Sequence, residues 1–319
     1  MAEQRVIRAP RRFAPPGGSS LSLDSLSHQL KKNWKMYVLI APFTILFFIF
    51  TVLPVMVSIF YSFTTFNVLE SPVYVGLQNY FRMFLHDELF TKAIGNTLVL
   101  AVAIGPIGYL LCLIVAWLIN ELSPKIRAVV TLLFYAPAIS GNVYLIWSVM
   151  FSGDQYGYIN SMLLNLSIRD EPINFLKDPN YMIWIVIFVA LWSSLGTGFL
   201  AFIAGFQGVD KTLFEAGAVD GVKNRWQELW FITLPSIRPQ MLFGAVISIT
   251  SAFGVGAICT ALCGFPSSQF AVHTIMNHME DYGGARYEMG YASAIATVLF
   301  LLMLGSNFLV RKIISKVGQ

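Results

Sequence analysis

The clearest pattern in this chain is the alternation of long apolar runs with polar connections. Six runs are each long enough for the roughly 20 residues that a membrane-spanning helix needs. They lie at about 37–65, 93–120, 128–151, 181–206, 240–263 and 289–310. The pattern predicts an all-α membrane protein with six transmembrane helices.

Composition and charge agree with a membrane location and predict an orientation. Of the 319 residues, 56% are hydrophobic and only 12% are charged, whereas soluble proteins carry about a quarter charged residues. With the N-terminus inside, sixteen of the 21 Lys and Arg fall on the cytoplasmic side and five on the outer side. Cytoplasmic loops are enriched in these residues, so we expect both termini in the cytoplasm.

Polarity also divides the chain into segments. Residues 1–35 form a basic N-terminal arm without the pattern of a cleaved signal peptide. Basic arms sometimes bind nucleic acid, but this arm precedes a span, which favours topology control and anionic lipid headgroups. We expect 36–92 to hold the first span and an outer loop, 93–312 a five-helix transport core, and 313–319 a C-terminal tail.

The three outer connections, about 66–92, 152–180 and 264–288, carry ten of the seventeen acidic residues. The sequence from Gly157 to Asn160, followed by Leu163 and Leu164, predicts a short amphipathic segment on the outer surface. These connections either receive a docking partner or are plain loops.

The longest polar-rich insert, 210–239, carries signals for two helices. Thr212 with Glu215 reads as a capping box, so a helix should begin near Leu213. Gly221 is placed to end that helix with a positive φ. Asn224 with Gln227 repeats the start signal for a second helix, which Pro235 should close. Between the two helices, we expect Glu215, Asp220 and Lys223 to be free to meet a cytoplasmic partner.

Several kinds of chemistry have no sequence signal. No predicted span contains Asp, Glu, Lys or Arg, although carriers driven by ions or protons place such groups inside the membrane. The phosphate-binding loop ending in Gly-Lys-Ser/Thr is absent, so ATP should bind elsewhere. Neither Gly-x-Ser-x-Gly nor His-Glu-x-x-His occurs, which disfavours a membrane enzyme.

Cysteine and histidine offer two further possibilities. Cys112, Cys259 and Cys263 lie in apolar runs and predict no disulfide framework; the last two could form a metal pair or simply pack. His273 and His278 precede Glu280 and Asp281. This group could bind a metal, but a solvated outer loop is the favoured interpretation.

The polar insert resembles the EAA loop of inner-membrane permeases in binding-protein-dependent ABC importers. That pattern reads Glu-Ala-Ala, two residues, Asp-Gly-Ala, then an apolar run ending in Leu-Pro. The matching residues are Glu215, Ala216, Asp220, Gly221, Leu234 and Pro235, while Gly217 and Val222 replace the usual alanines. Asn96-Thr97-Leu98 and the segment 290–294 extend the resemblance over about 90–310. Within the family, the pattern is similar to the maltose-type, carbohydrate-uptake branch.

The resemblance implies a type I permease fold and a set of partners. A coupling loop, 207–239, would dock into an ATPase subunit through residues Glu215, Ala216, Gly217, Asp220, Gly221 and Lys223. It implies a second permease, an ATPase dimer that holds ATP and Mg²⁺, and an extracytoplasmic solute-binding protein in a bacterial inner membrane. No cofactor is expected on this chain itself.

A carbohydrate path needs aromatic faces and hydroxyl or amide partners near the middle of the bilayer. The candidates are Tyr135, Asn142, Tyr144, Trp147, Trp192, Ser193, Ser194, Thr197, Ser248, Thr250 and Ser251. The favoured seven of these are Tyr144, Trp192, Ser193, Ser194, Thr197, Ser248 and Ser251. Each is otherwise a helix-packing residue. An acidic oligosaccharide would favour a basic lining, which the spans lack, although another subunit could supply it. The other open alternatives are a permease for amino acids, peptides or phosphonates, an ion channel and a membrane enzyme.

Overall fold

The computed structural model describes residues 33–141 and 143–315. Most of the predicted basic arm, residue 142 and the end of the predicted tail lie outside these ranges. The chain divides into two compact units, residues 1–56 and 57–319. The division falls inside the segment predicted to hold the first span, and each unit is described by itself.

The first helical segment is apolar on all sides. It joins α2 (Trp34–Phe47), the π-helical turn η1 (Phe48–Val52) and α3 (Leu53–Tyr61) into one 28-residue stretch. None of its residues is buried within the chain. A helix that is hydrophobic all round belongs in a lipid or protein environment rather than in water.

Residues 57–319 form a bundle of apolar helices with short elements at its ends. Its long unbroken helices are α5 (Glu88–Asn120) and α17 (Met289–Ile314). Three further pairs of helices are bent, by angles from 40° to 86°. In the described part of the chain, three helices are long and apolar enough to cross a membrane, or up to six if each bent pair counts as one span.

The remaining elements follow in chain order. They are β1 (Thr64–Thr65), β2 (Val73–Tyr74), α4 (Gln78–Leu85), α6 (Pro124–Ile139), α7 (Val143–Met150), α8 (Tyr158–Asn165), α9 (Pro179–Ser193), α10 (Thr197–Gln207), α11 (Lys211–Val219), α12 (Arg225–Glu228), η2 (Leu229–Thr233), α13 (Leu234–Ser236), α14 (Arg238–Phe253), α15 (Gly256–Cys263), η3 (Ser268–Phe270), α16 (Ile275–Glu280) and η4 (Asp281–Ala285). The two short strands pair antiparallel.

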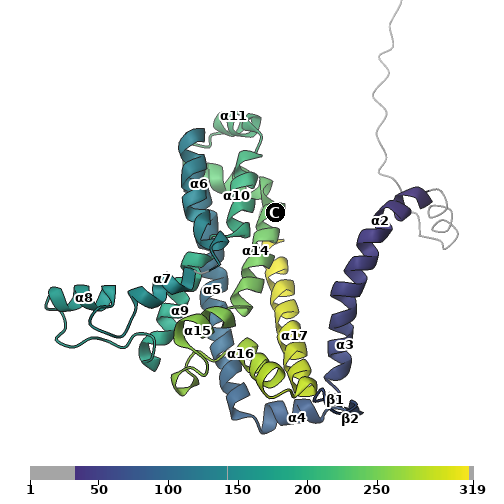
Figure 1. Cartoon of the computed structure of the whole chain (residues 1–319). Helices are drawn as coiled ribbons and strands as arrows, with labels where there is room; N and C mark the ends of the chain where they lie inside the picture. Colours follow the sequence, from purple (N-terminus) through teal and green to yellow (C-terminus); the bar gives the residue numbers. More distant parts are fainter. Residues whose placement is uncertain (1–32, 142, 316–319) are drawn as a thin grey trace, which may run out of the picture. The chain divides into compact units, whose positions relative to one another are not determined.

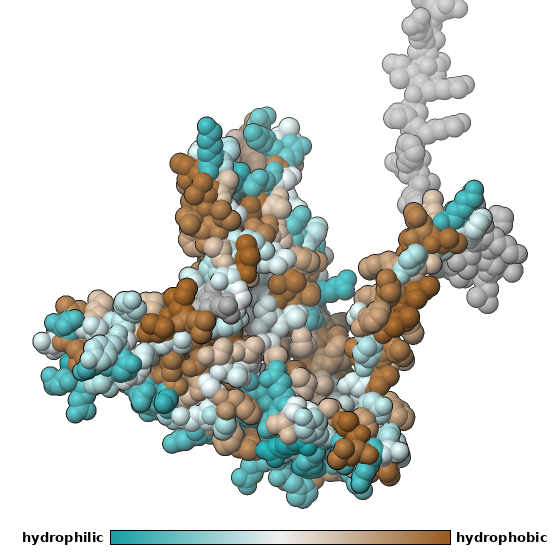
Figure 2. All heavy atoms as spheres, viewed as in Figure 1, coloured by the Kyte–Doolittle hydropathy of each residue, from teal (hydrophilic) through white to brown (hydrophobic). Residues whose placement is uncertain are grey.

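Within residues 57–319, α11 lies at one end of the long helices, and α4 with the β1–β2 hairpin lies at the other (Figure 1). Brown, hydrophobic atoms cover the flank of α6 between teal, hydrophilic regions near these two ends (Figure 2). An apolar band between polar ends is the surface that a bilayer requires.

The core forms where α5 packs against α9, α10 and α14. Small residues let these helices approach closely: a Cβ added at Gly198 would lie 3.6 Å from Gly244 Cα, and one at Gly105 would lie 3.6 Å from Ala252 Cβ. Such close packing of small residues is typical of helices in membranes. The apolar run predicted at 240–263 is divided into α14 and α15 at Gly254, the residue that caps α14.

The histidines of the segment 264–288 are buried, so its interpretation as a solvated loop was wrong. His273 is 3% exposed and His278 is 1% exposed. His278 Nε2 lies 3.0 Å from Asp87 Oδ2, and His278 Nδ1 lies 3.1 Å from His273 Nε2. Tyr291 Oη donates to Asp87 at 2.7 Å. We call these four residues the outer cluster.

The outer cluster is tied to helix ends by capping bonds. Asp87 is the N-cap of α5 and accepts from Phe90 N at 2.9 Å. Burial alone raises the pKa of Asp87, but the hydrogen bonds from Tyr291 and Phe90 and the nearby His278 lower it overall. Burial lowers the pKa of His278, and it lowers that of His273 to about 4. No local sequence signal indicates this arrangement, because Asp87 is about 200 residues away from its partners.

The two cysteines and the two histidines were considered as metal ligands. All three cysteines are free thiols, with Cys112 and Cys259 buried. Within residues 33–141 and 143–315, no three His, Cys, Asp or Glu side chains are grouped closely enough to hold a metal ion.

Candidate functional site

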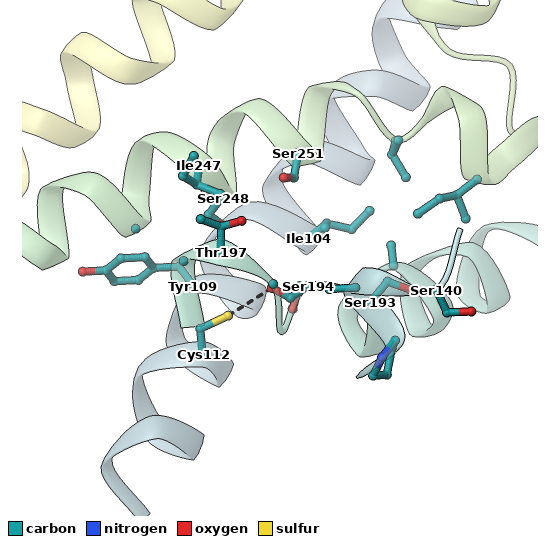
Figure 3. A pocket seen from close by; sticks show the side chains of 18 of the residues that line it. Ile104, Tyr109, Cys112, Ser140, Ser193, Ser194, Thr197, Ile247, Ser248 and Ser251 are labelled. Carbon is teal, nitrogen blue, oxygen red and sulfur yellow. Dashed lines mark hydrogen bonds between the residues drawn. The ribbon is translucent and has the colours of Figure 1, made fainter. Parts of the chain in front are cut away.

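A cavity of about 320 Å³ lies where several broken helices meet α5. Residues from α5, α6, α9, α10, α14 and α15 line it, and Tyr144 of α7 also belongs to the lining. Figure 3 shows ten of the lining residues with labels, among them Tyr109, Ser193 and Ser248. Among the described residues of this lining, none is Asp, Glu, Lys or Arg. The polar groups of the lining are therefore hydroxyls, backbone amides and carbonyls, one thiol and two phenols.

The structure brings most of the predicted path residues together. Six of the seven favoured candidates line the cavity: Tyr144, Ser193, Ser194, Thr197, Ser248 and Ser251. Trp192 is not in the lining. Its ring packs edge-on against Trp147, with the ring centroids 5.1 Å apart, because it points to a different side of α9 from Ser193.

The wider set of candidates is spread over other environments. Tyr135 packs against the core cluster that contains Phe199 and Phe202. Thr250 is exposed and donates to Val246 O within its own helix. Trp147 belongs to an aromatic group with Phe151 and Trp192. Asn142 lies outside the described residues.

The break between α9 and α10 gives the cavity part of its polar wall. The two helices meet at 40°. Ser194 O accepts from Gly196 N at 2.7 Å and from Cys112 Sγ at 3.3 Å. Ser194 Oγ donates to Leu191 O at 2.6 Å. Non-helical backbone at membrane depth is tolerated where it lines a cavity or is buried in protein, and this break does both.

Two buried hydroxyl oxygens of the lining have no hydrogen-bond partner within the described chain: Tyr109 Oη and Ser193 Oγ. Ser248 Oγ, in contrast, donates to Gly105 O at 2.7 Å. Buried hydroxyls in proteins nearly always have partners, so each exception calls for an explanation. A solute that offers hydroxyl groups would supply the missing partners.

Sequence reasoning missed Tyr109. Its ring packs edge-on against Phe202, with the centroids 5.4 Å apart. In the sequence it stands between Gly108 and Leu110 in an apolar run, where an aromatic residue is ordinarily a packing residue. The phenol itself was the available signal, because a buried tyrosine hydroxyl usually needs a partner.

The polar insert folds as two short helices, but the first begins earlier than predicted. Asp210, not Thr212, is the N-cap of α11, and its Oδ1 accepts from Thr212 N at 3.0 Å. Hydrogen bonds from the Thr212 backbone and side chain lower the pKa of Asp210. The capping box assigned to Thr212 and Glu215 was therefore wrong, because a carboxylate two residues upstream supplies the cap.

The end of α11 has the predicted geometry. Gly221 has φ +93° and Val222 N donates to Gly217 O at 2.9 Å, which closes the helix. A Cβ at Gly217 would lie 2.6 Å from Ile232 Cδ1. The glycine that replaces the usual alanine is thus buried against the second helix and faces away from solvent.

The other residues assigned to coupling are on the surface. Glu215, Ala216, Asp220, Gly221 and Lys223 are all exposed. Asp220 caps the C-terminus of α11 and does not cap the second helix. Their exposure leaves them accessible to another protein, while Gly217 and Gly221 shape the turn between the helices.

The second helix is started by Asn224, whose Oδ1 accepts from Gln227 N at 2.9 Å, as predicted. It continues through η2 and α13 to Ser236 and is not closed by Pro235. Pro235 falls in the first turn of α13, just after a π-helical turn, where its missing amide proton is tolerated.

The second helix is fastened to the end of α5. Arg225 lies 3.3 Å from Glu121 Oε2 and 2.8 Å from Glu228 Oε2. The Trp117 and Trp226 rings have centroids 4.8 Å apart. Since α5 also carries Tyr109 and Cys112, one helix connects the coupling loop with the cavity.

Apolar helices around an uncharged polar cavity, with an exposed helical loop at one end, define a membrane permease. Residues 25–319 match the family of binding-protein-dependent transport system inner membrane components, and the chain belongs to this family. It is 32% identical to the probable ABC transporter permease YesP of Bacillus subtilis, over 86% of this chain and 88% of that protein.

Other relatives have named substrates. The arabinooligosaccharide permease AraP of Bacillus subtilis is 28% identical over 84% of each chain. The lactose permease LacF of Rhizobium radiobacter is 30% identical over 74% of this chain and 76% of that protein. These findings confirm the family that the EAA-like loop indicated and an inner-membrane location for its members. They also make the chain a transporter subunit rather than an enzyme.

Solved structures agree with the fold. A chain of a bacterial ABC transporter involved in import of the acidic polysaccharide alginate superposes with a TM-score of 0.71 and 28% identity, over 90% of this chain and 99% of that chain. The bacterial alginate ABC transporter in complex with an alginate pentasaccharide-bound periplasmic protein gives a TM-score of 0.72, over 92% and 99%. The importer permease fold is thereby confirmed.

Proposed function

We propose that this chain conducts a carbohydrate, an oligosaccharide or a related polyol, through the cavity between α5, α9–α10 and α14. The observation that carries the proposal is the uncharged lining with two buried, unpartnered hydroxyl oxygens, Tyr109 Oη and Ser193 Oγ. A sugar offers both donors and acceptors to such a wall, and aromatic faces such as Tyr144 suit its rings.

The relatives support this class of solute. Their named substrates include arabinooligosaccharides, lactose and alginate. Another relative, at 26% identity, is a permease of an sn-glycerol-3-phosphate transport system. The uncharged wall favours the neutral parts of a sugar. The carboxylates of an acidic oligosaccharide would be neutralised by a second permease subunit.

We further propose the assembly in which the chain works. The chain crosses the bacterial cytoplasmic membrane six times, with both termini in the cytoplasm. It pairs with a second permease, identical or different. Two ATPase subunits bind ATP and Mg²⁺ and dock on the coupling loop, and an extracytoplasmic binding protein delivers the solute. The sequence-based charge asymmetry supports this orientation.

In this assembly, Glu215, Ala216, Asp220 and Lys223 contact the ATPase. Their exposure on and after α11 supports this role. Closure of the ATPase dimer would move α11, and the Arg225–Glu121 and Trp226–Trp117 contacts would carry that motion to α5. A cavity closed on one side would then open to the other.

The experiment is ATP hydrolysis and solute uptake by the complex in proteoliposomes, with a panel of binding proteins loaded with neutral oligosaccharides, acidic oligosaccharides, amino acids or glycerol phosphate. Wild type is compared with Glu215→Ala, and Thr212→Ala is the matched control on the same helix. We expect a sugar to stimulate hydrolysis, and Glu215→Ala to lose most of that stimulation.

The outcomes separate the parts of the proposal. Stimulation by an amino acid or a phosphate ester alone would replace the carbohydrate assignment. Normal transport by Glu215→Ala would remove this residue from the coupling role. A purified chain that associates with no ATPase would contradict the assembly itself.

A further inference from the structure

The second helix of the coupling loop lies almost at a right angle to the helix that follows it. Residues Arg225–Ser236 and Arg238–Phe253 meet at 82°. The later of the two, α14, packs along α5 and α17, the long unbroken helices of the bundle. Membrane-crossing helices are tilted on average about 20° from the bilayer normal. With α14 at such a tilt, the second helix lies closer to the membrane plane than to the normal.

Two contacts give the depth of the second helix. The rings of Trp226 and Trp117 have centroids 4.8 Å apart, and Arg225 Nη2 lies 3.3 Å from Glu121 Oε2. Both partners stand at the end of α5, whose stretch 98–119 contains no charged or amide side chain. As a helix this stretch extends about 33 Å, close to the roughly 30 Å of the hydrocarbon core. The second helix is thus level with the boundary between hydrocarbon and headgroups.

The second helix is buried on one side and exposes two aromatic residues on another. Leu229, Thr233 and Leu234 are buried, and the two leucines belong to the core of the bundle. Trp230 and Phe231 are 65% and 67% exposed. Tryptophan is enriched where a membrane protein meets the headgroups, because its ring is apolar and its N–H is polar.

Basic side chains flank these aromatic residues. The second helix and its two ends carry Lys223, Arg225 and Arg238, against Glu228 alone. Arg225 pairs with Glu228 at 2.8 Å, and Arg238 donates to Ser315 O. Lys223 is exposed. Anionic headgroups attract basic residues near the membrane surface, so this distribution of charge is complementary to an anionic leaflet.

Lipid suits the exposed aromatic residues better than the ATPase does. The side of the second helix that faces α11 carries Ile232, whose Cδ1 would lie 2.6 Å from a Cβ at Gly217. The coupling helix α11 therefore packs on Ile232 and leaves Trp230 and Phe231 exposed. Aromatic residues on one face and basic residues at the ends are typical of a helix that lies in the plane of the bilayer surface.

From this orientation, depth and exposure, we infer that the second helix is a membrane-surface anchor. Trp230 and Phe231 insert among the phospholipid headgroups of the adjacent leaflet, and Lys223 binds anionic headgroups. The inference rests on the proposed crossing of the bilayer by α5 and α14, and it adds lipid as a partner of the coupling loop. The anchor holds the second helix at a fixed depth while α11 moves with the ATPase.

The test attaches a nitroxide spin label to Phe231→Cys in the whole complex, in nanodiscs of phosphatidylcholine with phosphatidylglycerol. Cys112, Cys259 and Cys263 are replaced by alanine, and melting curves show that each labelled complex is folded. The control label is on Val219→Cys, because Val219 is also apolar and is 88% exposed at the end of α11. Collision of each label is measured with oxygen, which concentrates in lipid, and with a water-soluble nickel chelate.

We expect oxygen collision at residue 231 to be several-fold higher than at residue 219, and nickel collision at 231 to be low, because a polar chelate is excluded from apolar surroundings. High nickel collision at 231 would place the residue in water. Low collision with both reagents would place it beneath the ATPase or the second permease. Either of these two results would overturn the anchor.

The contribution of charge is measured with the same label. Oxygen collision at residue 231 should rise when phosphatidylglycerol is added to phosphatidylcholine nanodiscs, and it should rise less in the Lys223→Gln variant. An equal rise in both proteins would contradict the role of Lys223 in binding anionic headgroups.

A third label separates this inference from the proposal on which it rests. Leu110→Cys lies near the middle of the apolar stretch of α5 and is 52% exposed. Nickel access there would contradict the crossing of α5, and the anchor would fail with it. A shielded label at 110 with a water-exposed label at 231 would leave the crossing intact and overturn the anchor alone. Neither result depends on which solute is carried.

Discussion

Two buried polar regions of this permease differ in the side chains that form them and in how completely their polar atoms are paired. In the outer cluster, the Asp87 carboxylate accepts from Phe90 N, Tyr291 and His278, and His278 in turn contacts His273. Of the side-chain polar atoms of these four residues, His273 Nδ1 alone is buried without a partner in the described chain. In the cavity, Tyr109 Oη and Ser193 Oγ are buried with no partner in the described chain. A nearly fully paired network holds helices of the fold together, whereas unpaired polar groups in a cavity lining can bind a ligand.

From this contrast we propose that the solute passes through the cavity and that the outer cluster has a structural role. The ionisable residues of the outer cluster connect the N-terminal ends of α5 and α17. The unpartnered neutral hydroxyls belong to Tyr109 and Ser193, two residues that line the cavity. If this division is right, damage to the first region should reduce stability, and damage to the second should reduce uptake while stability stays constant.

The largest expected effect is on stability, from Asp87→Ala. The change removes the N-cap of α5 and leaves the Tyr291 hydroxyl and His278 without their acceptor. We expect a loss of about 2–4 kcal/mol in the free energy of unfolding. Asp87→Asn keeps an acceptor at the cap and should lose about half as much. Thermal unfolding of the purified complex measures both, and unchanged melting for Asp87→Ala would contradict the structural role.

The next effect is on transport alone. Ser251→Trp places a bulky ring in the cavity, and we expect uptake to fall at least about tenfold, because the solute needs that volume. Thr250→Trp is the matched control, since Thr250 is exposed and is not among the lining residues. Uptake assays on both variants measure transport, and melting curves show whether either variant is destabilised. Equal uptake by the two variants would mean that the cavity is not the path.

The helical spans were predictable from sequence because a bilayer requires long apolar runs, and each run does fall on helical segments. The breaks within the spans were harder to predict. The chain divides at Gly254 and between Ser194 and Gly196, where glycine and serine carry weak local signals and packing decides. The prediction of exactly six spans and of cytoplasmic termini stays a prediction.

Caps show the same limit at shorter range. Thr212 with Glu215 had the right spacing for a capping box. The N-cap of α11 is Asp210 instead, because its carboxylate is a stronger hydrogen-bond acceptor. The positive φ of Gly221 was predicted correctly, because it depends only on the backbone freedom of glycine. The buried state of His273 and His278 was beyond sequence reasoning, since Asp87 approaches them only in the folded chain.

A smaller, pH-dependent effect tests the outer cluster further. The pKa of His273 is lowered by burial to about 4 in the folded chain, against an ordinary value of 6.5. A depressed pKa means that its stabilising effect is complete above pH 6.5 and is lost as pH falls toward 4. Asp87 adds a loss only below its ordinary pKa. We expect the melting temperature to fall by roughly 3–6 °C between about pH 7 and about pH 5.

The control for this pH effect is His273→Gln, which cannot titrate and keeps a polar side chain. Its melting temperature should change less than that of wild type over the same pH range. An identical fall in both proteins would show that other groups cause the loss of stability.

We propose that transport depends on recognition of the solute by the unpartnered hydroxyls of the cavity lining, Tyr109 Oη and Ser193 Oγ. It can be measured as the concentration dependence of carbohydrate uptake in proteoliposomes for Tyr109→Phe combined with Ser193→Ala. Removing two unpartnered hydroxyls should leave melting unchanged or slightly raised. It should also increase the KM for uptake several-fold, because the solute loses two hydrogen bonds. Unchanged uptake kinetics in a well-folded double variant would contradict this role of the hydroxyls.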